Sequence, residues 1–162
     1  HTHRQTYGHF DYWERLKVLK MNSQQRRLER YRIIYTWQIL EGLAPNCDNT
    51  LHEPVSERAG RKCNIPKIKT KTRQSVKTLR EQSFQVHGPQ LYNCLPLSIR
   101  NKTKCSVLEF KEVLDNYLTL IPDQPKVGML IPSTCDMFNL SPSNSLIDQI
   151  REYQAKRTRT VG

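Results

Sequence analysis

The clearest pattern along the chain is an apolar stripe at helical spacing over residues 23–43. Apolar side chains recur there every three or four positions, and Asn22 or Ser23 supplies a side-chain cap for the first turn. Gly42 and Pro45 mark its end, because neither residue favours continuation of a helix. The predicted apolar face contains Leu28, Tyr31, Ile34, Tyr35 and Ile39.

A second strong helix is predicted over residues 106–121. Ser106 and Glu109 have the spacing of a capping box, and six apolar residues follow on one face. Weaker patterns predict three more helices: 11–20, a short one opened by Gly88 and Pro89 that ends before Pro96, and a last one from Asn144 or Ser145 to about Arg157.

Between the helical stretches, residues 44–62 have the composition of a loop, and two segments have that of strands. Residues 62–68 contain Ile65 and Ile68, and residues 76–86 contain several β-branched and large apolar side chains. The alternation of apolar and polar positions is imperfect in both segments. We expect a β-hairpin at about residues 62–86, with its tip near residues 67–73.

These elements predict a mostly α fold with one small β-hairpin, an α+β arrangement with a small helical core. We expect a disordered start over residues 1–10 and a basic helical domain over 11–121. Four prolines between 122 and 143 predict a proline-rich linker or arm, and residues 144–162 form a terminal helix and tail. The absence of an initiator Met at His1 is what we expect of a piece of a longer protein.

Positive charge dominates the chain and is concentrated in one segment. The net charge is +11 and the pI about 9.6, which favours polyanionic partners such as nucleic acid. Residues 58–80 hold nine Lys and Arg side chains and no carboxylate. Held on a hairpin, these side chains would form an electropositive finger for a phosphate backbone. The alternative is a solvated loop without a ligand.

The start of the predicted helix 23–43 is also rich in arginine, although a helix N-terminus disfavours cations. Either a bound phosphate or acidic residues elsewhere in the protein would compensate these charges. Together, the two basic regions supply the predicted nucleic-acid-binding residues: Arg26, Arg27, Arg30, Arg61, Lys67, Lys69, Lys71 and Arg73.

The sequence offers little sign of catalysis or metal binding. It contains no Asp-Asp, Asp-Glu or Asp-x-Asp pair, no nucleophile elbow and no phosphate loop. Cys47, His52 and Cys63 lack the spacing of a zinc site and a fourth ligand. Aromatic residues such as Tyr31, which could stack nucleobases, lie at core-like helical spacing. We therefore predict no catalytic residue, no metal, no cofactor and no membrane partner.

Several short stretches, in a particular order, carry a family resemblance. They are YWERLK at 12–17, QRRLERYRIIY at 25–35 and WQILEGL at 37–43, then SF at 83–84, GP at 88–89, LYNCLP at 91–96 and IRN at 99–101, and finally FK at 110–111, LD at 114–115 and IPD at 121–123. Their order resembles the region that follows the reverse transcriptase domain in jockey-like, LINE-type non-LTR retrotransposon polyproteins. The resemblance covers most of residues 11–123.

This resemblance implies a non-catalytic segment on the thumb side of an RNA-directed DNA polymerase whose catalytic aspartates and endonuclease lie upstream. It implies RNA or DNA and the polymerase domain of the same polyprotein as partners, and an intracellular, nuclear location. One alternative is a protein-interaction or structural module in which helices 23–43 and 106–121 brace the polymerase. Another is a degenerate transposon copy without function.

Overall fold

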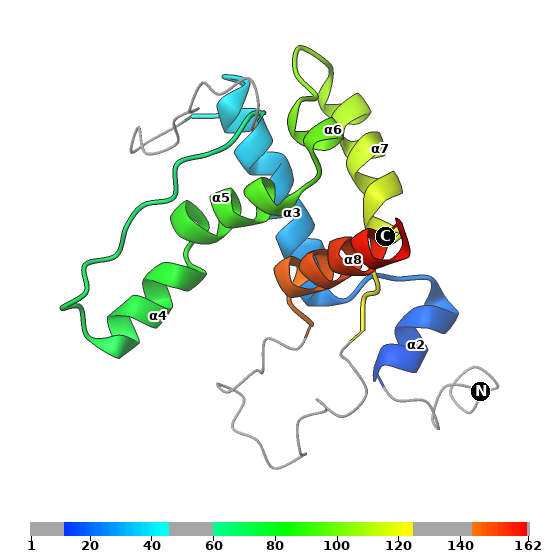
Figure 1. The fold of residues 1–162 in the computed structure, drawn as a ribbon, viewed down its shortest axis with the longest axis horizontal. Coiled ribbons are helices and arrows are strands. Elements are labelled where there is room, and N and C mark those ends of the chain that lie inside the picture. The colour runs from blue at the N-terminus through cyan, green and yellow to red at the C-terminus, as the bar shows by residue number, and fades with distance from the viewer. Residues whose placement is uncertain (1–11, 46–59, 125–143, 162) are drawn as a thin grey trace, which may run out of the picture.

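The computed structural model describes residues 12–45, 60–124 and 144–161, and within these ranges the chain is all α. Seven helices and no strand occur there (Figure 1). The helices are α2 (Tyr12–Leu19), α3 (Gln24–Leu40), α4 (Gln74–Gln82), α5 (Phe84–Cys94), α6 (Leu97–Arg100), α7 (Val107–Leu118) and α8 (Leu146–Val161).

Helix α3 is the element around which the core assembles. It packs against α5 and α7, while α8 packs on α5 and α6 on α7 (Figure 1). Trp37 of α3 stacks on Phe110 of α7 with ring centroids 4.5 Å apart, and both side chains are fully buried. The Trp37 indole N–H donates to the carbonyl of Lys102 at 2.7 Å, so its polar atom is satisfied inside the core.

Local capping explains where α3 and α7 begin, as the sequence predicts. The Ser23 hydroxyl accepts a hydrogen bond from the Arg26 N–H at 3.0 Å, and the Ser106 hydroxyl accepts one from the Glu109 N–H at 3.2 Å. At the other end of α3, Gly42 adopts a positive φ of 74°, which reverses the chain at little steric cost.

The predicted β-hairpin at residues 62–86 is wrong. Residues 61–73 form no regular structure, a turn occurs at 69–72, and the residues predicted for the second strand belong to α4 and the start of α5. Val76 and Leu79 lie three positions apart, which is helical spacing, and Gln, Lys, Arg and Glu around them are good helix formers. A strand also needs a partner strand, and the described residues provide none.

Helix α5 begins earlier than the sequence predicts, at Phe84 instead of Gly88, and Pro89 lies inside it. Ser83 alone separates α4 from α5, with extended backbone angles. A side chain at Gly88 would lie 2.7 Å from the Thr36 hydroxyl of α3 and 2.9 Å from the Phe84 ring. The glycine therefore permits the close approach of α3 and α5.

Helix α8 belongs to the same core as the preceding helices. Leu146 and Ile150 are fully buried and join the cluster formed by α3, α5 and α7. The Leu146 N–H, at the start of α8, donates to the Glu29 carboxylate of α3 at 3.0 Å. The expected disordered start, most of the loop at 44–62 and most of the proline-rich linker at 122–143 lie outside the described residues.

Candidate nucleic-acid interface

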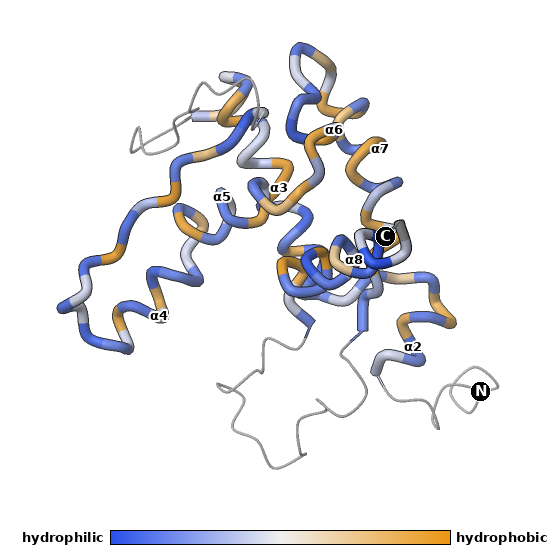
Figure 2. The backbone as a smooth tube through the Cα atoms, viewed as in Figure 1, coloured by the Kyte–Doolittle hydropathy of each residue, from blue (hydrophilic) through white to orange (hydrophobic). Residues whose placement is uncertain are grey.

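The most basic part of the structure is the segment from residue 61 to residue 80, which we call the basic arm. It consists of the irregular stretch 61–73 and most of α4, and its backbone runs away from the core before α4 returns to α5 (Figure 1). Hydrophilic residues predominate along it (Figure 2), and α4 has no buried residue. The arm carries eight cations and no carboxylate: Arg61, Lys62, Lys67, Lys69, Lys71, Arg73, Lys77 and Arg80.

The root of the arm is fixed to α5 by a reciprocal pair of hydrogen bonds. The Asn93 side chain accepts from the Cys63 N–H at 2.8 Å and donates to the Cys63 carbonyl at 2.9 Å. The Cys63 side chain is buried. Just before the arm, Gly60 has a φ of 67°, and a side chain there would collide with Leu97. The root is therefore specified by tertiary contacts.

Beyond this root, the predicted phosphate-binding residues Lys67, Lys69, Lys71 and Arg73 are all exposed. Within the described part of the chain, their side chains have no ion pair or hydrogen bond. Like charges at this density repel one another unless an anion lies nearby. These four side chains therefore present positive charge to solvent, with no carboxylate partner among the described residues.

The first arginine of α3, Arg26, is buried and hydrogen-bonded, unlike the exposed cations of the arm. Arg26 is 2% exposed, and its guanidinium donates to the carbonyls of Leu118, Ile121 and Pro122 and to the Gln149 side chain, at 2.7–3.4 Å. Burial lowers the pKa of Arg26, while Asp123 and Glu29 act in the opposite direction. Its charge lies against carbonyls at the C-terminal end of α7, the negative end of that helix dipole.

The N-terminus of α3 is occupied by a carboxylate of the chain itself. Asp123 accepts from the Ser23 N–H at 2.6 Å and from the Ser23 hydroxyl at 2.7 Å. The sequence left two explanations open for the arginine cluster, a bound phosphate or acidic residues of the protein. At this end of the helix, an acidic residue of the protein takes that place. Arg26 is consequently a structural residue and leaves the set of candidate ligand-binding groups.

Two more of the predicted binding residues have carboxylate partners. Arg30 makes a two-pronged pair with Asp115 of α7, at 2.6 and 2.9 Å, and this pairing raises its pKa. Arg61 donates to Glu41 at 3.1 Å. Arg27, by contrast, is exposed on α3. The structure thus leaves five of the eight predicted residues exposed to solvent: Arg27, Lys67, Lys69, Lys71 and Arg73.

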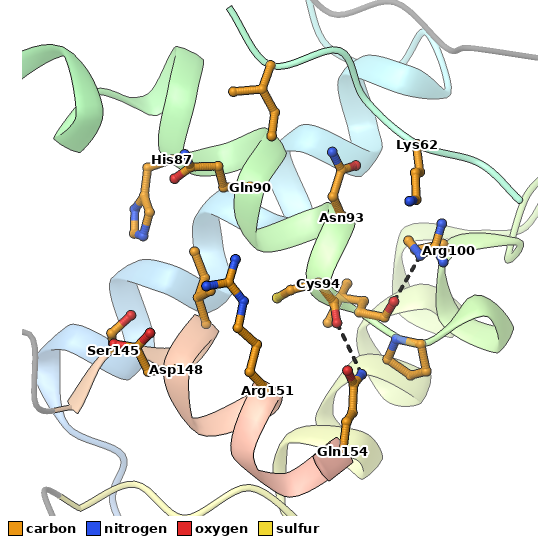
Figure 3. A pocket seen from close by; sticks show the side chains of 14 residues that line it. Lys62, His87, Gln90, Asn93, Cys94, Arg100, Ser145, Asp148, Arg151 and Gln154 are labelled. Atoms are coloured by element: carbon orange, nitrogen blue, oxygen red, sulfur yellow. Dashed lines mark hydrogen bonds between the residues drawn. The ribbon is translucent and has the colours of Figure 1, made fainter. Parts of the chain in front are cut away.

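A groove of about 710 Å³ lies beside the root of the arm, between α5 and α8 (Figure 3). Lys62 and Ile65 of the arm form part of its wall, so the groove and the arm are continuous. Arg151 of α8 points into it toward α5 (Figure 3). Asp148 is the one carboxylate among its lining residues, against three cations, so the lining is net positive.

Two groups that line this groove, His87 and Cys94, are neutral near pH 7. Burial, with a smaller effect of Arg32, lowers the pKa of His87 to about 4, and its ring contacts the Arg32 guanidinium at 2.6 Å. Burial raises the pKa of the Cys94 thiol to about 12. Neither group is prepared for base or nucleophile chemistry. Within the described ranges, no three His, Cys, Asp or Glu side chains are grouped to hold a metal ion. Cys47 and His52 lie outside these ranges.

Sequence reasoning missed Arg151 and assigned Tyr31 to the core. It counted Lys62 in the basic segment 58–80 but did not place it among the predicted binding residues. Arg151 comes from a segment almost ninety residues beyond Lys62, so no local pattern joins them. Tyr31 is 64% exposed, although its spacing is that of a core residue. The sequence did contain one sign that Tyr31 could be exposed. The apolar stripe on α3 is wider than the face that neighbouring helices cover.

Comparison of the chain with protein-family models, curated proteins and solved structures gave no match in any of the three. None of the helices among the described residues combines the length and apolar character needed to cross a bilayer.

Proposed function

We propose that this chain is a non-catalytic nucleic-acid-binding module that holds RNA or DNA through its phosphate backbone. The observation that carries the proposal is the basic arm, where eight cations occur without a carboxylate and the outer four are exposed and unpaired within the described residues. Each phosphate neutralised by Lys or Arg releases condensed counterions, and this release drives binding. Lys62 and Arg151 extend the positive surface into the groove.

The resemblance in sequence suggests the setting of this module. We propose that it follows the reverse transcriptase of a jockey-like non-LTR retrotransposon polyprotein and holds the template, primer or target near that polymerase. The polymerase domain would be its partner within the same polyprotein, and its location would be nuclear. The chemistry would remain with the upstream domains, and this chain would supply affinity and position.

The salt dependence of binding tests this proposal. The chain should bind a labelled RNA or DNA oligonucleotide at low salt, and the affinity should fall steeply as salt rises. Changing Lys69→Glu together with Lys71→Glu should weaken binding and make the plot of log K against log salt shallower. The slope should decrease by about 1.4 or more, because each phosphate that a cation neutralises contributes about 0.7–0.9 to it.

The matched control is Lys17→Glu together with Lys20→Glu. These lysines are exposed on and just after α2, and the substitutions change the net charge equally. The control should weaken binding less and retain the slope of the unaltered chain. Equal reductions in affinity for the two variants would show that binding responds to net charge alone and would contradict a role for the arm.

A second candidate function is docking onto another protein, and α2 favours it. Tyr12, Val18, Leu19 and Met21 on α2 and the following turn are 47–52% exposed, and α2 has no buried residue. On α3 and α7, by contrast, most of the large apolar side chains belong to the core of this chain or pack against it. The change Val18→Glu with Leu19→Glu should abolish association with the polymerase domain and preserve oligonucleotide binding if docking occurs through α2.

A further inference from the structure

An aromatic group lies on the outer surface of α3, next to the point where α4 joins α5. The Tyr31 and Tyr35 rings are one helical turn apart, nearly parallel at 9°, with centroids 6.4 Å apart. Phe84, the first residue of α5, meets Tyr35 edge-on at 5.2 Å. Tyr31 is 64% exposed, and the other two rings are partly exposed.

This group is held in place by the packing of α3 against α5. Gly88 has no side chain, and the Phe84 ring lies over it, so close that a methyl group there would be 2.9 Å from the ring. The Arg32 guanidinium donates to the Gln82 carbonyl at 2.9 Å, which fixes the end of α4 against α3. The rings therefore need little ordering when a ligand arrives.

Two exposed arginines, Arg27 and Arg80, lie on the helices that carry or adjoin these rings. Arg27 lies four residues before Tyr31, on the same side of α3, and it is exposed. Arg80 is in the last turn of α4, close to the α4–α5 junction, and is also exposed, with Glu81 as the neighbouring carboxylate. Exposed aromatic faces beside cations are the combination with which proteins hold unpaired nucleobases and their phosphates.

We propose that Tyr31, with Tyr35 and Phe84, is a stacking platform for unpaired bases, and that the nucleic acid bound by this chain is single-stranded there. This inference rests on the proposed function, because the arm supplies the phosphate contacts. Bases in a duplex are already stacked and do not offer a free face to an aromatic ring. An apolar protein partner would be a different occupant, and in that case Tyr31→Ala would leave the affinity for single-stranded RNA unchanged.

The experiment measures the affinity of the full chain for a mixed-sequence RNA 12-mer, single-stranded and as a duplex, over a series of salt concentrations. Tyr31→Ala should weaken binding of the single strand about tenfold, within the range of about 5- to 150-fold for one stacked base, and change duplex binding less than twofold. The slope against salt should not change, because tyrosine carries no charge.

Three further variants complete the experiment, two as controls and one as a fluorescence reporter. Leu28→Ala removes a side chain of α3 that is 50% exposed and not aromatic, and it should leave affinity unchanged. Tyr31→Phe retains the ring and should retain the affinity. Tyr31→Trp should bind normally, and its indole fluorescence should be quenched when the single strand is added, since a base would lie against it.

The outcomes separate this inference from the proposed function. If the unaltered chain binds neither form of RNA at low salt, the proposed function fails. If it binds with the expected salt dependence but Tyr31→Ala behaves like Leu28→Ala, the platform alone is refuted. Equal reductions in affinity for single strand and duplex would also refute stacking, as would unquenched fluorescence in Tyr31→Trp.

Discussion

Glu29 offers a quantitative test of how a charge is tolerated within this core. Its side chain is 2% exposed and accepts from the Gln25 amide at 3.2 Å and from the Leu146 N–H at 3.0 Å. Burial raises its pKa from 4.5 to about 6, more than its hydrogen bonds and the nearby Arg26 and Arg32 lower it. The folded protein therefore holds the Glu29 proton at a pH where the unfolded chain has released it.

The sign of the effect on stability follows from this difference. Between pH 4.5 and about 6 the folded state binds more protons than the unfolded state, so the free energy of unfolding falls as pH rises through that window. The pKa difference of about 1.5, at about 1.4 kcal/mol for each pKa unit, means that the buried carboxylate costs about 2 kcal/mol at pH 7.

Glu29→Gln removes the charge and retains a similar shape. We expect this variant to be more stable than the unaltered chain by up to about 2 kcal/mol at pH 7, or about 4–8 °C in Tm, and equally stable below pH 4.5. Urea unfolding followed by tryptophan fluorescence at several pH values measures the difference. His87 reduces stability as pH falls from 6.5 toward 4, and its Nε2 lies 3.8 Å from Glu29 Oε1. Making the comparison in a His87→Gln background removes this contribution from both proteins.

The control is Glu112→Gln, which changes an exposed carboxylate on α7 and should alter stability by less than about 0.5 kcal/mol. If Glu29→Gln destabilises the protein at pH 7, or if its effect is the same at pH 4.5, the reasoning is refuted. Attraction to Arg26 and Arg32 would then outweigh the cost of burying the carboxylate.

Three further substitutions test the packing by the same unfolding measurement. Arg26→Met should lower the free energy of unfolding by about 3 kcal/mol or more, because it leaves buried carbonyls and Glu29 without their cation. A decrease below about 1 kcal/mol would contradict that role. Gly88→Ala should cost about 1–3 kcal/mol through the contact with Thr36, and a stabilised variant would show that α3 and α5 can separate freely. Asp115→Asn should cost less than about 1 kcal/mol, since the pair with Arg30 is 29% and 46% exposed; a cost above about 2 kcal/mol would contradict this.

The helices that sequence predicts well are those with local start signals and long apolar periodicity. Ser23 and Ser106 cap α3 and α7 from within the first turn, so their position depends on few distant residues. The hairpin prediction failed because Val76 and Phe84 suggest a strand by residue type, whereas strand formation needs a partner. Helix α4 satisfies its backbone hydrogen bonds within itself.

The candidate binding residues also differ in whether local sequence or distant contacts determine their role. Lys69 and Lys71 lie in a segment without carboxylates, and sequence alone indicated their positive surface. Arg26 lies in an equally basic segment, yet its partners are carbonyls 92 to 96 positions away. No pattern within α3 distinguishes Arg26 from Arg27, although one is buried and the other is exposed.

The sequence by itself therefore determined the strong helices, their caps and the charge of the basic arm, because each depends on residues within a few positions of one another. The tertiary structure decided which arginines have partners within the protein, that Tyr31 faces solvent, and that α5 and α8 enclose a groove beside the arm. These outcomes depend on which helix ends and which helix faces come into contact. Such contacts form only when segments a hundred residues apart in the sequence pack together.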